Sequence, residues 1–180
     1  MKFTILILTI FLTSCVTADK TNNLFDDLAN KTSVVIYLSK HGLDSVPKEI
    51  GRLKAVKKLY ITKDSAKGWT IYPPLFAIDP RTEKPPFRQL PNEITELSSL
   101  HLLALIDLDL KTLPDNFDKL ENLDTLSLFM NKLTISNETE KLKKLKKLKY
   151  LDVVGNNVDS IAIQELKTAI PGIMIKSRIE

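Results

Sequence analysis

The sequence predicts a repeat fold of the α/β class, and three observations support this prediction. The window from Leu123 to Leu133 carries apolar residues at its positions 1, 4, 6 and 11 and an asparagine at position 9. Neither the two-residue period of a strand nor the 3.6-residue period of a helix explains that spacing. The window recurs along the chain, and a proline-containing motif recurs between its copies. Self-similarity at a fixed period indicates a repeat architecture.

The recurring window predicts a short strand followed by a tight turn. Leu126 and Leu128 are expected to point to one side of the strand, because strand side chains alternate. The turn then lets Asn131 offer its side-chain amide to backbone groups. Aligned on this window, the strand-forming pairs are Ile36/Leu38, Leu59/Ile61, Leu103/Leu105, Leu126/Leu128, Leu151/Val153 and a shorter Ile173/Ile175. Position 9 of the first five copies holds His41, Asp64, Leu108, Asn131 and Asn156.

A second motif lies between the strands, at residues 46–53, 90–97 and 113–120. Each copy starts with Val-Pro or Leu-Pro and places two further apolar residues at intervals of three. Proline fixes φ and donates no hydrogen bond, which suits a bent return segment rather than a strand. The strand windows that these motifs separate begin 23 residues apart from Leu100 to Leu123 and 25 residues apart from Leu123 to Leu148.

Together the two motifs resemble the leucine-rich repeat, and the proline-containing half is similar to bacterial repeats of about 23 residues. The resemblance covers residues 33–175. It implies a leucine-rich-repeat solenoid over residues 33–180, with about five to six repeats and a parallel, concave sheet.

Both ends of the solenoid are expected to carry a cap helix, since a repeat buries its apolar face only against its neighbours. Residues 22–32 predict the N-terminal cap helix, with Leu24, Phe25 and Leu28 on one face. Residues 161–170 predict the C-terminal cap helix, which Pro171 and Gly172 end.

Residues 1–14 have the features of a signal peptide. Lys2 is followed by an apolar run from Phe3 to Leu12, which is too short to span a membrane. The run ends in Leu-Thr-Ser-Cys, which resembles a bacterial lipobox and implies cleavage before Cys15 and acylation of its thiol. Residues 15–21 would then form a lipid-anchored tether.

The lipobox implies a lipid-anchored protein of the cell envelope that faces the periplasm or the cell surface. Two or more acyl chains attach a protein firmly, because each buried methylene contributes about 0.8 kcal/mol. The alternative is an ordinary secretory cut after Ala18, which would leave a secreted protein.

Two segments depart from the regular repeat. The interval from Val56 to Leu100 is 44 residues, so an insertion is expected at about 65–86, including Trp69. Loops of this length are usually functional or disordered. Because the insertion holds the single tryptophan of the chain, we expect an ordered loop packed on the sheet. In the lysine-rich tract 138–149, leucines every third residue are expected in the core and the lysines in solvent. The alternative is contact of these lysines with anionic lipid or polysaccharide.

The sequence shows no phosphate-binding glycine loop, no paired Cys/His ligands and no nucleophile–base arrangement. Asp107 and Asp109 are expected at turns, with a cation site as the alternative. The net charge of +4 does not by itself indicate nucleic acid, and the single cysteine excludes an internal disulfide. We therefore expect no catalysis, no cofactor and no bound metal.

The predicted function is a surface-tethered binding module for a protein or a glycan; the alternative is a structural envelope lipoprotein that self-associates. The expected binding surface is the concave sheet at repeats three to five. If positions 4 and 6 point inward, positions 3, 5 and 7 point outward. The residues proposed to bind a partner are Tyr37, Tyr60, Leu102, Ile106, Phe129, Met130, Tyr150 and Val154. Exposed apolar patches and aromatic residues mark interaction sites, although strand propensity or coverage by the insertion would also explain the pattern.

Overall fold

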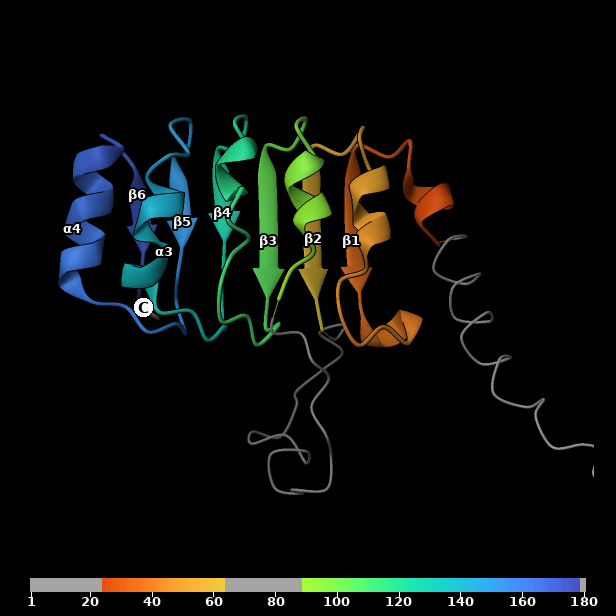
Figure 1. Ribbon diagram of the computed structural model, residues 1–180, viewed down its shortest axis with the longest axis horizontal. Coiled ribbons are helices and arrows are strands. Elements are labelled where there is room, and N and C mark those ends of the chain that lie inside the picture. Colours follow the sequence, from red (N-terminus) through yellow and green to blue (C-terminus); the bar gives the residue numbers. More distant parts are fainter. Residues whose placement is uncertain (1–23, 64–88, 179–180) are drawn as a thin grey trace, which may run out of the picture.

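The computed structural model describes residues 24–63 and 89–178, and the solenoid that they form is shown in Figure 1. The predicted signal peptide, Cys15, the tether and the insertion at about 65–86 lie outside the described residues. Six strands form one parallel sheet in chain order. The strands are β1 (Ser33–Tyr37), β2 (Lys58–Thr62), β3 (Leu102–Ile106), β4 (Thr125–Ser127), β5 (Tyr150–Asp152) and β6 (Met174–Lys176).

Helical segments return the chain along one face of this sheet (Figure 1). The return segments are the 3-10 helices η2 (Lys48–Arg52), η3 (Asn92–Glu96) and η4 (Phe117–Lys119) and the α-helices α3 (Ile135–Leu142) and α4 (Ser160–Ala169). Pro47 and Pro91 cap η2 and η3 in extended conformation, with φ of −78° and −67°. Proline suits this position because its fixed φ is compatible with a helix start and its missing donor has no partner there.

The core lies between the sheet and the return segments. Val34, Leu59, Leu103, Leu126 and Leu151 occupy equivalent positions in consecutive strands, and each is at most 2% exposed. In the lysine-rich tract, the predicted core leucines are buried, with Leu145 at 1% and Leu148 at 2% exposure. The expectation that these leucines continue the core is confirmed.

Short helices cover both ends of the core. Residues 24–28 form the N-terminal cap helix, in which Phe25 is fully buried. The prediction of a helix over 22–32 is too long, because the chain turns at residues 29–30 and reaches β1 directly. At the other end, the Asp159 carboxylate caps α4 by accepting a 2.7 Å hydrogen bond from the Ala162 N–H. A side-chain acceptor at this position satisfies an N–H that has no partner inside the helix.

The solenoid is continuous across the interval that holds the predicted insertion. β2 pairs with β3 over five residues, from Lys58↔Leu102 to Thr62↔Ile106. Behind the sheet, η2 and η3 pack so closely that a Cβ on Gly51 would lie 2.9 Å from the Cβ of Glu93. The two described flanks therefore stack as adjacent repeats.

The predicted register is wrong at both ends of the sheet. Val34 and Ile36, rather than Ile36 and Leu38, pair with Leu59 and Ile61. In the last repeat Ile175, rather than Ile173, pairs with Leu151. A two-residue shift leaves every side chain on the same face, so alternation of apolar residues cannot detect it. Only pairing with the neighbouring strand decides between the two alignments.

The shift also changes the residue at position 9 of the first repeat. Ser39 lies five residues after Val34, just as Asn131 lies five residues after Leu126. The predicted His41 instead ends the 3-10 helix η1 (Ser39–His41) and is exposed. Gly42 follows with φ of +65°, a left-handed conformation that glycine adopts without steric cost.

Candidate functional site

The face of the sheet that carries no helical segment is the candidate site, and we call it the open face. Its side chains form three rows, because residues two apart on each strand point the same way and the strands are paired in register. The first row is Ser33, Lys58, Leu102, Thr125, Tyr150 and Met174; the second row is Val35, Tyr60, Ala104, Ser127, Asp152 and Lys176. The third row is Tyr37, Thr62 and Ile106. Phe129 and Val154 lie two residues beyond the ends of β4 and β5, in the turns that follow these strands.

Most of the predicted binding residues lie on this face and are half-buried. They are Tyr37, Tyr60, Leu102, Ile106 and Tyr150. Phe129 is also half-buried, but it lies in the turn after β4. Paired parallel strands lie about 4.8 Å apart, so residues of one row are in reach of their neighbours. The structure thus brings together residues from β1 to β5 that are up to 113 positions apart in the chain, from Tyr37 to Tyr150.

Val154 does not belong to this surface. It was predicted to face outward at position 7, but its side chain is only 2% exposed. β5 ends at Asp152, and residues 154–155 form a turn in which the Val154 N–H donates to the Asp152 carboxylate at 3.0 Å. Strand alternation no longer governs the direction of a side chain in such a turn.

Met130 is exposed, at 40%, but it lies in a turn rather than in a row of the sheet. Its φ of +57° is unusual for a residue with a side chain. A Cβ on the neighbouring Gly155 would come within 2.7 Å of the Met130 sulfur. The Met130 side chain therefore packs against the backbone of the next turn, at the rim of the open face.

Tyr37 and Tyr60 do not stack at one level, as the predicted register required. Tyr60 pairs with Val35, whereas Tyr37 pairs with Thr62. The two tyrosines sit diagonally on adjacent strands and still share the open face. Diagonal neighbours are within reach of aromatic side chains.

The apolar part of the open face is centred closer to the N-terminus than predicted. On β1 to β3 the outward residues include Val35, Tyr37, Tyr60, Leu102, Ala104 and Ile106. On β4 and β5 they include Thr125, Ser127 and Asp152. Val35, at 48% exposure, was not among the predicted binding residues. The predicted alignment already placed it at outward position 3, but the binding surface was assigned to repeats three to five, so position 3 of the first repeat was not considered.

The turn at one end of β4 is held by Asn131, whose side chain is nearly fully buried. Its Oδ1 accepts hydrogen bonds from the Leu108 and Leu110 N–H groups, at 3.0 and 3.2 Å. Its Nδ2 donates to the carbonyl oxygens of Leu105 and Leu128, at 2.8 and 2.9 Å. One side chain thereby satisfies backbone groups of two consecutive repeats, as the sequence predicted.

Asn156 repeats this arrangement one repeat later. Its Nδ2 donates to the Leu128 and Val153 carbonyls at 2.7 and 3.1 Å, and its Oδ1 accepts from the Leu133 N–H at 3.1 Å. The chain is a leucine-rich-repeat solenoid. Three features define this fold here: stacked parallel strands, buried leucines at equivalent positions, and an asparagine that links consecutive turns.

Both aspartates follow the end of β3, as predicted, but Asp107 is exposed whereas Asp109 is half-buried. Asp107 and Asp109 both have φ of +53°, a conformation in which aspartate is enriched. Asp109 forms an ion pair with Lys132 at 2.6 Å, which links the turns of two repeats. Within residues 24–63 and 89–178, no group of three or more His, Cys, Asp or Glu side chains is arranged to hold a metal ion.

Buried and paired acids in the described part of the chain serve the fold. The Glu138 carboxylate accepts from the Thr112 hydroxyl at 2.9 Å and the Leu113 N–H at 3.2 Å, and it pairs with Lys141 at 3.2 Å. On the return face, a hydrogen bond and the charge of Lys54 lower the pKa of Glu96. Both acids bind groups of a neighbouring repeat, and neither faces the open face. The helices of the described residues include none long and apolar enough to cross a membrane.

Among the known proteins compared with this chain, the matches are to solved structures. No protein-family model matches the sequence, and no curated protein matches it significantly. Among solved structures, a leucine-rich-repeat protein of Leptospira interrogans is 25% identical over 74% of this chain, with a TM-score of 0.46. Internalin C2 of Listeria monocytogenes is 20% identical over 74% of this chain, with a TM-score of 0.42. The match spans 34% of the first protein and 48% of the second.

Proposed function

We propose that this chain is a non-catalytic binding module, tethered to a bacterial membrane, that recognises a partner protein through its open face. The observation that supports this most directly is the cluster of half-exposed apolar side chains on β1 to β3. We call this cluster the apolar patch: Val35, Tyr37, Tyr60, Leu102 and Ile106.

The apolar patch has the composition of a protein interface. Contiguous apolar surface is unfavourable in water and commonly marks an interaction site. Tyrosine is enriched among the residues that dominate binding energy, because it buries a large ring and keeps a polar hydroxyl. Phe129 and Tyr150 extend the patch toward β4 and β5. The polar side chains Thr125, Ser127 and Asp152 would then form part of its rim.

Rigidity supports the same proposal. The strands of the patch are paired in register, and their inward neighbours Leu59, Ile61 and Leu103 are fully buried. A partner that docks on such a surface does not have to order the backbone, so less binding free energy is lost. Binding sites on regular elements are also better defined in geometry than sites on loops.

The proposed tether rests on the lipobox. Acylated Cys15 would lie nine residues before Leu24, the first residue of the cap helix. Labelling of growing cells with a fatty acid tests this part separately. We expect label on the wild-type chain and none on Cys15→Ala; an unlabelled wild-type chain that begins at Asp19 would instead establish secretory cleavage.

The binding function is tested by a photoreactive amino acid placed at Tyr60, on the patch, and at Lys144, an exposed lysine outside the sheet. We expect a defined cross-linked protein in envelope preparations from the Tyr60 position only. Tyr37→Ala should then reduce capture about 30-fold, because loss of an interface hot spot costs about 2 kcal/mol.

Two results would contradict the proposal. Equal cross-linking from both positions would show contact without a defined site. A product with twice the mass of the chain would show self-association, the structural alternative. Phe129→Asp and Tyr150→Ala probe the extent of the patch, and we expect smaller losses at these flanking positions.

A further inference from the structure

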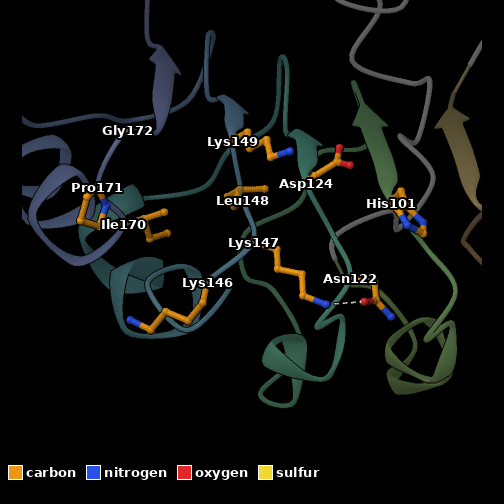
Figure 2. A pocket seen from close by; sticks show the side chains of 10 residues that line it. All are labelled: His101, Asn122, Asp124, Lys146, Lys147, Leu148, Lys149, Ile170, Pro171 and Gly172. Atoms are coloured by element: carbon orange, nitrogen blue, oxygen red, sulfur yellow. Dashed lines mark hydrogen bonds between the residues drawn. The ribbon is translucent and has the colours of Figure 1, made fainter.

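A basic cavity lies at the edge of the sheet where the strands begin, and it shares no residue with the apolar patch. Its volume is about 440 Å³, within the range of about 300–1,000 Å³ typical of small-molecule sites. Figure 2 shows the side chains that line it, which come from several successive repeats. The polar and charged residues are His101, Asn122, Asp124, Lys146, Lys147 and Lys149. We call this cavity the strand-start pocket.

The repeat itself brings these residues together. His101, Asp124 and Lys149 each directly precede a strand, at equivalent positions of consecutive repeats. Their backbones are linked, since Asp124 N–H donates to the His101 carbonyl at 2.9 Å and Lys149 N–H donates to the Asp124 carbonyl at 2.8 Å. The buried leucines 145 and 148 flank Lys146 and Lys147, which therefore point outward.

Lys147 is held in place by a short chain of hydrogen bonds. The Asn122 Nδ2 donates to the Ser98 carbonyl at 2.8 Å, which leaves its Oδ1 to accept from Lys147 Nζ at 2.7 Å (Figure 2). Lys146 Nζ donates to the Ala169 carbonyl at 3.4 Å. An ammonium group has three donors, so each lysine keeps further donors for a ligand.

These lysines differ from the first lysines of the same tract. Lys141 and Lys143 form ion pairs with Glu138 and Glu140. Across the described residues, Lys146, Lys147 and Lys149 take part in no ion pair, and the recorded partners of the first two are neutral oxygens. Asp124 is the one carboxylate among the described residues of the pocket, and its Oδ1 accepts from the Thr125 hydroxyl at 2.7 Å. The pocket thus carries an excess of positive charge.

We propose that the strand-start pocket binds a phosphate group. Lysine ammonium groups are compact point charges that suit a phosphate, whose oxygens accept hydrogen bonds from several directions. The phosphate could belong to a soluble phosphate compound or to the headgroup of an anionic phospholipid. This assignment does not depend on the proposed protein partner, because the pocket and the apolar patch share no residue.

Lysine footprinting of the full chain in neutral detergent tests the proposal. The amines are acetylated with and without inorganic phosphate at matched ionic strength, and acetylation of each lysine is followed by mass spectrometry. At phosphate equal to twice its Kd, acetylation of Lys146, Lys147 and Lys149 should slow about threefold, since one third of the sites stay free. The exposed Lys40 and Lys111 should not change.

A second pair of samples separates the two sources of phosphate. The full chain is incorporated into phosphatidylcholine vesicles with or without phosphatidylglycerol, and the same lysines are compared. Protection by phosphatidylglycerol alone assigns the pocket to a headgroup, protection by inorganic phosphate alone assigns it to a soluble compound, and protection by both supports the shared chemistry. No selective protection in either experiment would overturn the proposal.

Two double variants with the same change in charge test whether the lysines of the strand-start pocket bind the phosphate. Lys147→Gln with Lys149→Gln should abolish protection of Lys146, while Lys40→Gln with Lys111→Gln changes the charge equally and should preserve it. Glutamine at 147 can still donate to Asn122, so the fold should be retained; the thermal midpoint verifies this. Unchanged protection of Lys146 in the first variant would overturn the assignment, and the wild-type footprint decides the question if that variant fails to fold.

Discussion

The N-terminal half of the sheet (β1 to β3) and the C-terminal half (β4 to β6) stabilise their turns with different side chains. On the C-terminal side, the turns near β4 and β5 close on Asn131 and Asn156, which donate to and accept from backbone groups of neighbouring repeats. On the N-terminal side, Ser39 occupies the equivalent position and donates to the Lys63 carbonyl at 2.7 Å while remaining exposed. The inward apolar residues of β1 to β5 are buried in both halves, and only at the terminal strand β6 is the inward Ile175 half-buried among the described strands.

The difference extends to the open face. Outward residues of β1 to β3 are mostly apolar, whereas those of β4 and β5 are mostly polar. Buried Asn131 and half-buried Asn156 thus lie in the half with the more polar open face, and the apolar patch lies in the other half. One continuous core can therefore support two unlike surfaces, because the inward and outward positions of a strand are independent.

The largest expected effect comes from the core, where the halves should be alike. Leu126→Ala in β4 and Leu59→Ala in β2 each remove a fully buried side chain. Each should lower the free energy of unfolding by about 3–5 kcal/mol, from lost burial and the cavity left behind. Thermal or urea unfolding measures the change.

Lys144→Ala is the matched control for these core variants, since Lys144 is exposed and should change stability by less than about 0.5 kcal/mol. A large loss for Leu126→Ala with little loss for Leu59→Ala would show that the two halves do not share one core.

A smaller effect should separate the halves at their turns. Asn131→Ala leaves the buried Leu108 and Leu110 N–H groups and the Leu105 carbonyl without this partner. Each unsatisfied buried group costs about 1–3 kcal/mol, so with three such groups we expect a loss of at least about 3 kcal/mol in the free energy of unfolding. Ser39→Ala, at an exposed position, should cost less than about 1 kcal/mol. Equal losses for the two variants would remove the distinction between the halves.

The smallest effect concerns the contact between η2 and η3. Lys54 lowers the pKa of Glu96, so the charged carboxylate stabilises the folded state. This contribution is complete above the pKa of the unfolded chain and is lost as the pH falls through the lower folded pKa. Glu96→Gln should therefore be slightly less stable than wild type near neutral pH, and the two should converge in acid. Unfolding curves as a function of pH measure this difference.

Lys54→Gln provides the control for this pair. It should reproduce the effect of Glu96→Gln, and the double variant should add little to either single variant. Additive losses would show that the two side chains act separately.

Most of the architecture could be predicted because the same spacing of apolar residues recurs in several repeats of the chain. A leucine at an inward position is supported by its counterparts in other copies, so an error in one copy does not change the fold. The cap helices followed from apolar residues on one helical face, such as Leu24, Phe25 and Leu28. The role of Asn131 followed from its amide, which both donates and accepts.

The candidate site was predicted less completely. Tyr37 and Tyr60 were placed on the correct face but at the wrong level, because a two-residue shift preserves alternation. Val154 was placed outward by counting along a strand that in fact ends at Asp152. Val35 was omitted because the binding surface was assigned to repeats three to five, although alternation placed Val35 on the correct face. In each case, local sequence determined the face of a side chain but not the neighbour that it meets.

The sequence by itself determined the repeat, the inward leucines and the turns, since these depend on spacing within one copy and on the hydrogen-bonding groups of single residues. Only the tertiary structure decided which residues share a row, where the apolar patch is centred and which lysines remain without a carboxylate. Those properties arise between repeats. They depend on pairing and packing among segments 20 or more residues apart, and no local period in the chain records them.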